Sequence, residues 1–198
     1  IDATAFSAYL QSHPSGLKVL GLADDRPIVV RNVAREAVQS ALELAQSMHA
    51  YVFVDLPRYV DEVTQATVEM ASHVVLVAEQ TVPALRDAKR LLAYLTKEAG
   101  IQRERIIVVI NRYDANAEVQ FGDVSAALGS EGLMCIPSDW QLVSACVNSG
   151  TLVVEQEPHS HVAAALEELE RRLTGQAGTA DSGLLARALK SLRQRVTR

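Results

Sequence analysis

The sequence predicts an α/β fold with a mostly parallel sheet and helices on both faces. The prediction rests on five short runs that are β-branched or aliphatic nearly throughout: Leu17–Leu22, Tyr51–Asp55, His73–Ala78, Arg105–Ile110 and Leu133–Ile136. Strands without polar alternation are typical of a sheet that is buried on both faces. Helical patterns separate the runs, and strands that alternate with helices indicate right-handed crossovers between parallel strands.

Composition and charge narrow the class of protein. The 198 residues suffice for one domain with a sizeable core, and 48% of them are hydrophobic. Only 5% are aromatic, so Val, Leu, Ile and Ala must build that core. The net charge is −5, but residues 181–198 hold five bases and one acid, a balance of +4, which leaves −9 for residues 1–180. An acidic body has no general attraction for nucleic acid, so we do not expect nucleic acid as a partner.

Helix start and stop signals fall between the apolar runs. Thr81-Val82-Pro83 offers a capping hydroxyl and a proline in the first turn, and the helix that it begins runs to about Glu98 and stops at Gly100. The other expected helices run from a cap at Asn32 to about His49, from Asp61 to Ala71, around Trp140–Val147 and from Val162 to Leu173.

We expect three segments: a folded domain over residues 1–174, a flexible linker over 175–183 and a basic amphipathic helix over 184–198. The last segment places Leu184, Leu189 and Val196 on one helical face, with arginines and a lysine around it. Such a helix can lie on an anionic membrane surface, pack on its own domain or a dimer partner, or stay solvated. Liposome co-sedimentation with and without residues 181–198 separates these alternatives.

The two cysteines, Cys135 and Cys146, are expected to be buried reduced thiols, because no cluster of His and Cys at metal-ligand spacing accompanies them. No apolar run reaches the roughly 18 residues of a membrane span, and no signal peptide opens the chain. We therefore expect a cytoplasmic protein.

Parallel sheets bind ligands outside the carboxyl ends of their strands, so the residues after each run are candidate site residues. Asp55 ends the run Tyr51–Asp55. An acid at the end of a buried strand costs desolvation unless something binds it, and a hydrated magnesium ion is one such partner. The alternative is that Asp55 accepts backbone N–H groups in the turn before Pro57.

A second candidate follows the fourth run, in Ile110-Asn111-Arg112-Tyr113-Asp114. The amide of Asn111 carries a donor and an acceptor, which is the complement of an adenine edge. Asp114 could instead accept from the N–H groups of guanine. Both residues also favour turns after strands, so a purely structural Asx turn is the alternative.

A third candidate follows the fifth run, in Ile136-Pro137-Ser138-Asp139. Backbone and side-chain groups here could line a base pocket. The alternative is that Ser138 or Asp139 only caps the helix that begins at Trp140.

Taken in order, these strand ends resemble those of the MinD/ParA superfamily of P-loop ATPases. The resemblance rests on Val54–Arg58, His73–Val77 with Leu85–Leu92, Val109–Asp114, Ile136–Asp139 and Asn148–Gly150, and it runs from about Asp2 to Leu173. The Asp-Leu-Pro-Arg and Asn-Arg-Tyr-Asp forms resemble its CpaE/TadZ branch, which helps place Tad (Flp) pilus machinery at the cell pole.

The resemblance implies roles for particular residues. Asp55 matches the catalytic acid that holds magnesium through water and senses the γ-phosphate. Asn111 and Arg112 match the adenine-reading turn, and Pro137 and Asp139 match the second wall of the base pocket. It also implies ATP and Mg²⁺ as cofactors, a homodimer, pilus or secretion proteins as partners, and a location at the cell pole or the inner face of the membrane.

The phosphate-binding loop of such ATPases is absent from residues 1–198. That loop needs Gly-x4-Gly-Lys-Ser/Thr; Gly16 and Gly21 have the spacing, but Gly21 is followed by Leu22 and Ala23 in place of Lys and Ser or Thr. The resemblance places the loop upstream of Ile1, and a chain that begins without Met is expected to be part of a longer protein.

Three functions remain open at this level. The first is an ATP-binding localisation factor for pilus assembly that dimerises with nucleotide. The second is a cycling partition or positioning ATPase of the MinD/ParA type, and the third is a scaffold that keeps the fold without nucleotide. The bulky Arg58 and Tyr59 after the Asp55 turn favour slow hydrolysis, because relatives tend to have small residues there.

We predict that the purified polypeptide of residues 1–198 does not hydrolyse ATP, because it contains no cradle of backbone N–H groups and lysine for the triphosphate. Phosphate release above the buffer rate, in a sample free of contaminating ATPases, would refute this.

Overall fold

The computed structural model describes residues 2–13, 15–21, 33–129 and 131–175. The chain divides between Met70 and Ala71 into two compact units, called unit 1 and unit 2 here, and each is described by itself. The expected linker beyond Gly175 and the amphipathic helix 184–198 lie outside the described residues, as does the cap at Asn32. That residues 1–174 form one domain stays a prediction.

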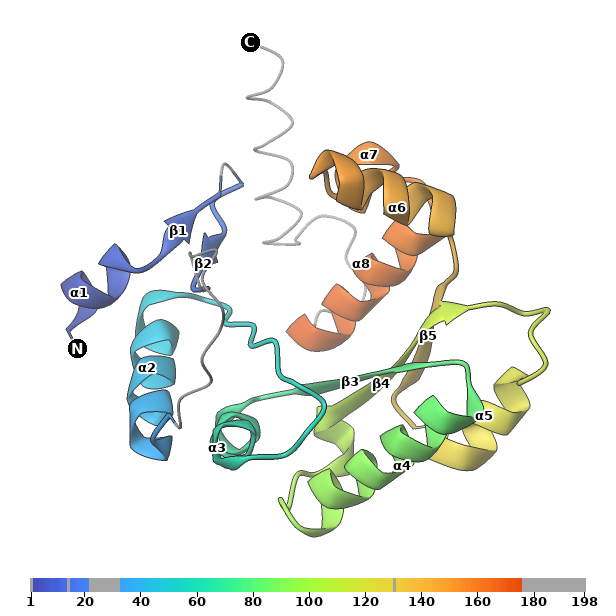
Figure 1. Ribbon diagram of the computed structural model, residues 1–198, viewed down its shortest axis with the longest axis horizontal. Helices are drawn as coiled ribbons and strands as arrows, with labels where there is room; N and C mark the ends of the chain where they lie inside the picture. The colour runs from blue at the N-terminus through green and yellow to red at the C-terminus, as the bar shows by residue number, and fades with distance from the viewer. Residues whose placement is uncertain (1, 14, 22–32, 130, 176–198) are drawn as a thin grey trace. The chain divides into compact units, whose positions relative to one another are not determined.

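Unit 2 contains a three-stranded parallel sheet in the order β3-β4-β5. The strands are β3 (Val74–Glu79), β4 (Ile106–Tyr113) and β5 (Leu133–Pro137). They confirm three of the five expected strands, and β4 continues three residues beyond its expected end at Ile110. Helices flank this sheet on both faces (Figure 1), so the α/β prediction is confirmed.

Two helices on one face of the sheet are α4 (Val82–Lys97) and α5 (Phe121–Leu128). α4 begins as expected, since the Thr81 hydroxyl accepts the N–H of Ala84 at 3.4 Å and Pro83 lies in the first turn. It ends before Gly100, whose φ is +67°. α5 was missed, although Gln120 and Asp123 form a capping box that marks its start.

The opposite face is covered by α8 (His161–Thr174), which follows α6 (Trp140–Ser149) and the short α7 (Val153–Gln156). Leu169 and Leu173 of α8 pack against a cluster formed by Ile107, Val109 and Met134. Both cysteines are free thiols; Cys146 of α6 is buried as expected, whereas Cys135 of β5 is only half-buried. Burial raises the pKa of Cys135, which keeps its sulfur protonated at neutral pH.

The centre of unit 2 is β4, in which Ile106–Ile110 are all buried. Successive side chains of a strand alternate between faces, so both sides of β4 are covered. β3 is one of the two outer strands of the described sheet, and its Val77 is 57% exposed.

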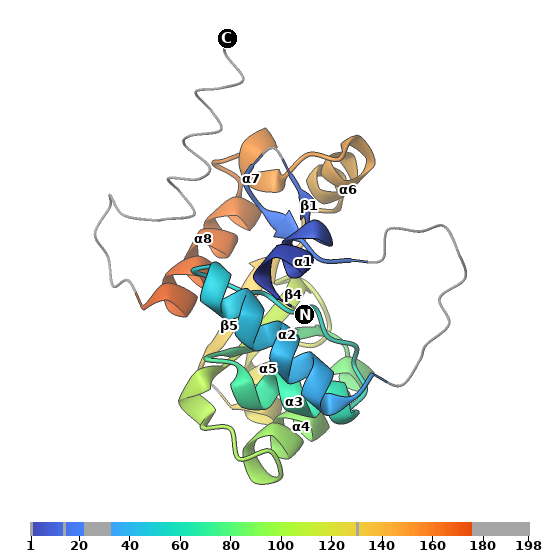
Figure 2. The same ribbon diagram turned by 90° about the vertical axis from the view of Figure 1, so that its left-hand side faces the viewer.

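Unit 1 holds α1 (Ala3–Ala8), the two-residue strands β1 (Gln11–Ser12) and β2 (Lys18–Val19), α2 (Arg35–Met48) and α3 (Glu62–Met70). α2 packs on α3 (Figure 2), and Arg35 of α2 pairs with Glu69 of α3. Asp61 caps α3 by accepting the N–H of Thr64 at 2.7 Å, and this bond lowers the pKa of its carboxyl.

Two expected strands differ from the structure, and both lie in unit 1. Of the expected Leu17–Leu22 strand the structure describes residues 17–21, and among these only Lys18–Val19 forms a ladder, antiparallel to β1, with both residues exposed. Tyr51–Asp55 has no strand, and Phe53 is 68% exposed. An apolar run becomes a strand only beside a partner, and the described part of unit 1 offers only the short β1–β2 ladder.

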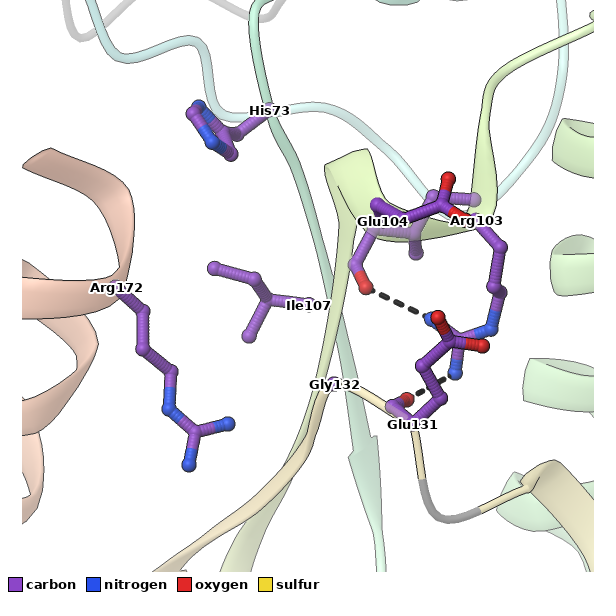
Figure 3. A pocket seen from close by; sticks show the side chains of 8 residues that line it. His73, Arg103, Glu104, Ile107, Glu131, Gly132 and Arg172 are labelled. Atoms are coloured by element: carbon purple, nitrogen blue, oxygen red, sulfur yellow. Dashed lines mark hydrogen bonds between the residues drawn. The ribbon is translucent and has the colours of Figure 1, made fainter. Parts of the chain in front are cut away.

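Two hydrogen bonds from Arg103, together called the latch here, join the starts of β4 and β5 in unit 2. The Arg103 guanidinium donates to the Ile106 carbonyl at 2.8 Å and to the Glu131 carbonyl (Figure 3). Beside it, at φ +65°, lies Gly132, where an added Cβ would stand 2.8 Å from the Ile106 oxygen. Only glycine fits this position without strain.

None of the helices in the described ranges combines the length and apolar character needed to cross a bilayer.

We predict that Gly132→Ala lowers the free energy of unfolding by about 1–3 kcal/mol, because the methyl group meets the Ile106 carbonyl at an unfavourable φ. Urea denaturation measures the change. Gly122→Ala is the matched control: nothing lies within 4 Å of its added Cβ, and an alanine in α5 should raise stability by up to about 1 kcal/mol. Equal effects of the two substitutions would contradict the latch.

Candidate functional site

The carboxyl ends of β3, β4 and β5 bring together four of the five predicted site residues. Asn111 and Arg112 lie in the last part of β4, while Pro137 ends β5 and Asp139 follows it. Glu79, at the end of β3, pairs in register with Asn111. Asp55 belongs to unit 1 and is treated separately below.

Asn111 and Arg112 lie in an irregular strand end and not in the expected free turn. The β4–β5 register shifts between Ile110 and Tyr113, and Arg112 has a φ of +54°. A left-handed conformation costs a residue other than glycine about 1–3 kcal/mol. The Asn111 side-chain oxygen supports it by accepting the Arg112 N–H at 3.0 Å. The half-exposed Asn111 amide therefore has its oxygen engaged locally, with its NH₂ group as the remaining donor.

The side chain of Arg112 links two strand ends across the site. One guanidinium nitrogen lies 3.0 Å from a carboxylate oxygen of Glu79. The guanidinium carbon lies 5.9 Å from the centroid of the Trp140 ring, within cation–π range. Sequence reasoning missed Glu79 and Trp140 as site residues, because neither stands in a motif and Glu79 is 33 residues from Arg112.

Gln80 fastens the loop after β4 to the end of β3. Its side-chain oxygen accepts the Asp114 N–H at 2.8 Å, and its NH₂ group donates to the Val119 carbonyl at 2.5 Å. Asp114 itself accepts the backbone N–H of Asn116 at 2.8 Å. This is the Asx turn that sequence analysis left open.

The third strand end is organised by its backbone. Asp139 accepts the Leu142 N–H at 3.0 Å and caps α6, which is the helix-capping alternative given for Ser138 or Asp139 in the sequence analysis. The Ser138 N–H donates to the Tyr113 carbonyl at 2.9 Å, and Pro137 pairs with Tyr113 in the β4–β5 ladder. Any contact of Asp139 with a base must therefore leave this cap in place or replace it.

Asp55 lies in an exposed segment without regular secondary structure. The desolvation argument for magnesium assumed a buried strand, and that assumption is wrong. Nowhere in the described residues do three or more His, Cys, Asp or Glu side chains gather into a metal site. Magnesium usually takes only one or two carboxylates together with phosphate oxygens and water. The fit of Asp55 to magnesium thus depends on the resemblance alone.

The residues of unit 2 fit the base of a nucleotide better than its phosphates. The strand ends supply an amide donor, a planar cation and an exposed aromatic ring, which are groups that bind bases. A hollow of about 320 Å³ lies at the opposite edge of the sheet, between His73, Ile107 and Arg172 (Figure 3). Arg172 is bonded to Glu168 at 2.8 Å, and Arg103, which also lines the hollow, donates to the carbonyls of Ile106 and Glu131.

Comparison with known proteins points to one superfamily. No model of a protein family matches the chain. The chain is 24% identical over 146 residues to the septum site-determining protein MinD of Bacillus subtilis, a match that covers 73% of this chain and 54% of MinD. It spans about half the length of the curated relatives that it matches.

Solved structures share the fold. A ParA family ATPase from Chlorobium tepidum has a TM-score of 0.72 at 24% identity, covering 85% of this chain and 70% of the ATPase. MinD of Pyrococcus horikoshii, solved in complex with Mg-ADP, has a TM-score of 0.57 at 18% identity, covering 74% of this chain and 60% of MinD. The sequence matches to MinD proteins and the shared fold together support homology of this chain to the MinD/ParA superfamily of ATPases.

Proposed function

We propose that this chain is the base-recognition part of an adenine-nucleotide-binding ATPase of the MinD/ParA positioning type. The observation that carries the proposal is Asn111, whose amide stands at the carboxyl end of the central strand of the described sheet. The Mg-ADP complex of the Pyrococcus horikoshii protein supports a nucleotide as the ligand class.

Each site residue has a role in this proposal. The Asn111 NH₂ group donates to a ring nitrogen of adenine, and the backbone from Pro137 to Asp139 forms the second wall of the base pocket. Arg112 borders the base, while its charge is balanced by Glu79. By its resemblance to the superfamily, Asp55 would hold hydrated Mg²⁺, and that ion would supply charge neutralisation for the phosphates. The phosphates themselves require a loop that residues 1–198 do not contain.

Assembly and location follow from the same proposal. The whole protein forms a homodimer with ATP bound between or beside its protomers, and acts in the cytoplasm or at the inner face of the membrane. In this reading, dimerisation depends on nucleotide, so the base contacts of unit 2 control assembly as well as binding.

We predict that Asn111→Ala weakens ATP binding by the full-length protein about tenfold, since a well-placed amide pair discriminates a base by about 1–3 kcal/mol. Calorimetry measures the affinity, and analytical ultracentrifugation with ATP measures the dimer. Gln46→Ala, which removes an exposed amide from α2, is the matched control and should bind normally. If Asn111→Ala leaves the dimerisation and localisation of the full-length protein untouched, the nucleotide pocket is vestigial and the chain is a scaffold.

A second candidate is a CpaE/TadZ-type localisation factor for Tad pilus or related secretion machinery. It is favoured by Asp55-Leu56-Pro57-Arg58 and by Asn111-Arg112-Tyr113-Asp114, together with the exposed Arg58 and Tyr59. Large side chains after the Asp55 turn obstruct close backbone approach to a γ-phosphate. ATP would then act as a clamp that holds a dimer at the cell pole and recruits pilus proteins.

For this candidate we predict that Arg58→Ala raises the ATPase rate of the full-length protein several-fold. Such an increase corresponds to an activation barrier lower by about 1 kcal/mol. Steady-state phosphate release measures the rate. Arg86→Ala, an exposed arginine of α4, serves as the control for charge loss alone. An unchanged rate in Arg58→Ala would count against the clamp.

A further inference from the structure

Trp140 presents a large aromatic surface at the carboxyl edge of the sheet. It is the first residue of α6 and the sole tryptophan of the chain, and it is 69% exposed. Tryptophan rings normally bury most of their surface. An exposed indole next to residues with base-binding chemistry indicates a surface that a ligand covers.

Arg112 and Glu79 place a planar cation beside that ring. The Arg112 guanidinium is 5.9 Å from the ring centroid, and the Glu79 carboxylate lies 3.0 Å from the guanidinium. The three side chains come from the end of β3, the end of β4 and the start of α6. Because the carboxylate balances the guanidinium, the group presents flat surface without net charge. Such a surface suits a nucleobase better than a phosphate.

A base that is bound by Asn111 needs a second surface to cover its face. An amide recognises a base through its edge, in the plane of the ring, and leaves both faces of the base bare. Stacking on an aromatic ring covers a face, and it is tolerant of base identity because every base has one. Edge recognition by Asn111 and face recognition by Trp140 are therefore complementary. Arg112, which follows Asn111 and contacts Trp140 through its side chain, has a φ of +54°.

We propose that Trp140 stacks on the nucleobase, and that Glu79 is a positioning residue that keeps Arg112 beside the ring. The inference rests on the proposed binding of an adenine nucleotide. It adds a contact that depends on the base and is independent of the phosphate loop, so adenosine without phosphates is a sufficient ligand for it.

The test uses Trp140 as its own reporter, because its emission is the only tryptophan signal of the 198-residue chain. The chain is titrated with adenosine, and separately with ATP and Mg²⁺, in a fluorimeter and a calorimeter. We expect saturable quenching by both ligands, with adenosine giving the same dissociation constant in both instruments. Trp140→Ala should weaken adenosine binding about tenfold, and Trp140→Phe should restore most of it.

The positioning role of Glu79 has a separate readout. Glu79→Gln removes the charge that holds Arg112, so the emission maximum of ligand-free Trp140 should shift and adenosine should bind about threefold more weakly. Glu118→Gln, an exposed acid in the loop before α5, is the control and should change neither. An unaltered emission maximum and affinity in Glu79→Gln would remove the positioning role.

The outcomes separate the two proposals. If calorimetry shows adenosine binding while Trp140 emission stays constant and Trp140→Ala binds equally well, the stacking inference is overturned and the proposed function stands. If the chain binds neither adenosine nor ATP in calorimetry, the proposed function fails, and the stacking inference fails with it.

Discussion

The burial of β4 on both faces is the constraint on which unit 2 depends. Five consecutive aliphatic residues, Ile106–Ile110, lie between helices on either side and between two parallel neighbours. A polar side chain within this stretch would lose its water without gaining a partner. Asn111 is thus the first position at which the central strand can present a polar group, and its place is set by a ladder that the core holds rigid.

The same reasoning explains what the sequence predicted well. β3, β4 and β5 were predicted because their apolar composition reflects burial within one sheet, and α4 because Thr81, Pro83 and Gly100 act on the neighbouring backbone alone. Tyr51–Asp55 has similar composition but no strand. Apolar composition shows that a segment can enter a sheet, whereas the ladder depends on which segments lie beside it, and a single run of residues does not record that.

The candidate site was predictable in position and less so in detail. Asn111, Arg112, Pro137 and Asp139 were expected at strand ends, and the structure has them there. Glu79, Gln80 and Trp140 were not expected, because each acts through a partner far away in sequence. The left-handed backbone of Arg112 could not be predicted from the sequence either, because it arises where the β4–β5 register shifts and not from any residue preference.

The exposed Val77 on the outer strand β3 bears on how the molecule behaves in concentrated solution. A strand at the border of a sheet carries N–H and C=O groups that can pair with another chain, and an apolar side chain next to them strengthens such pairing. Within the described sheet, the free edge of β3 is a place where a further strand can add by edge-to-edge pairing. Mass measurements in the absence of nucleotide set the baseline from which a ligand-driven assembly must be distinguished.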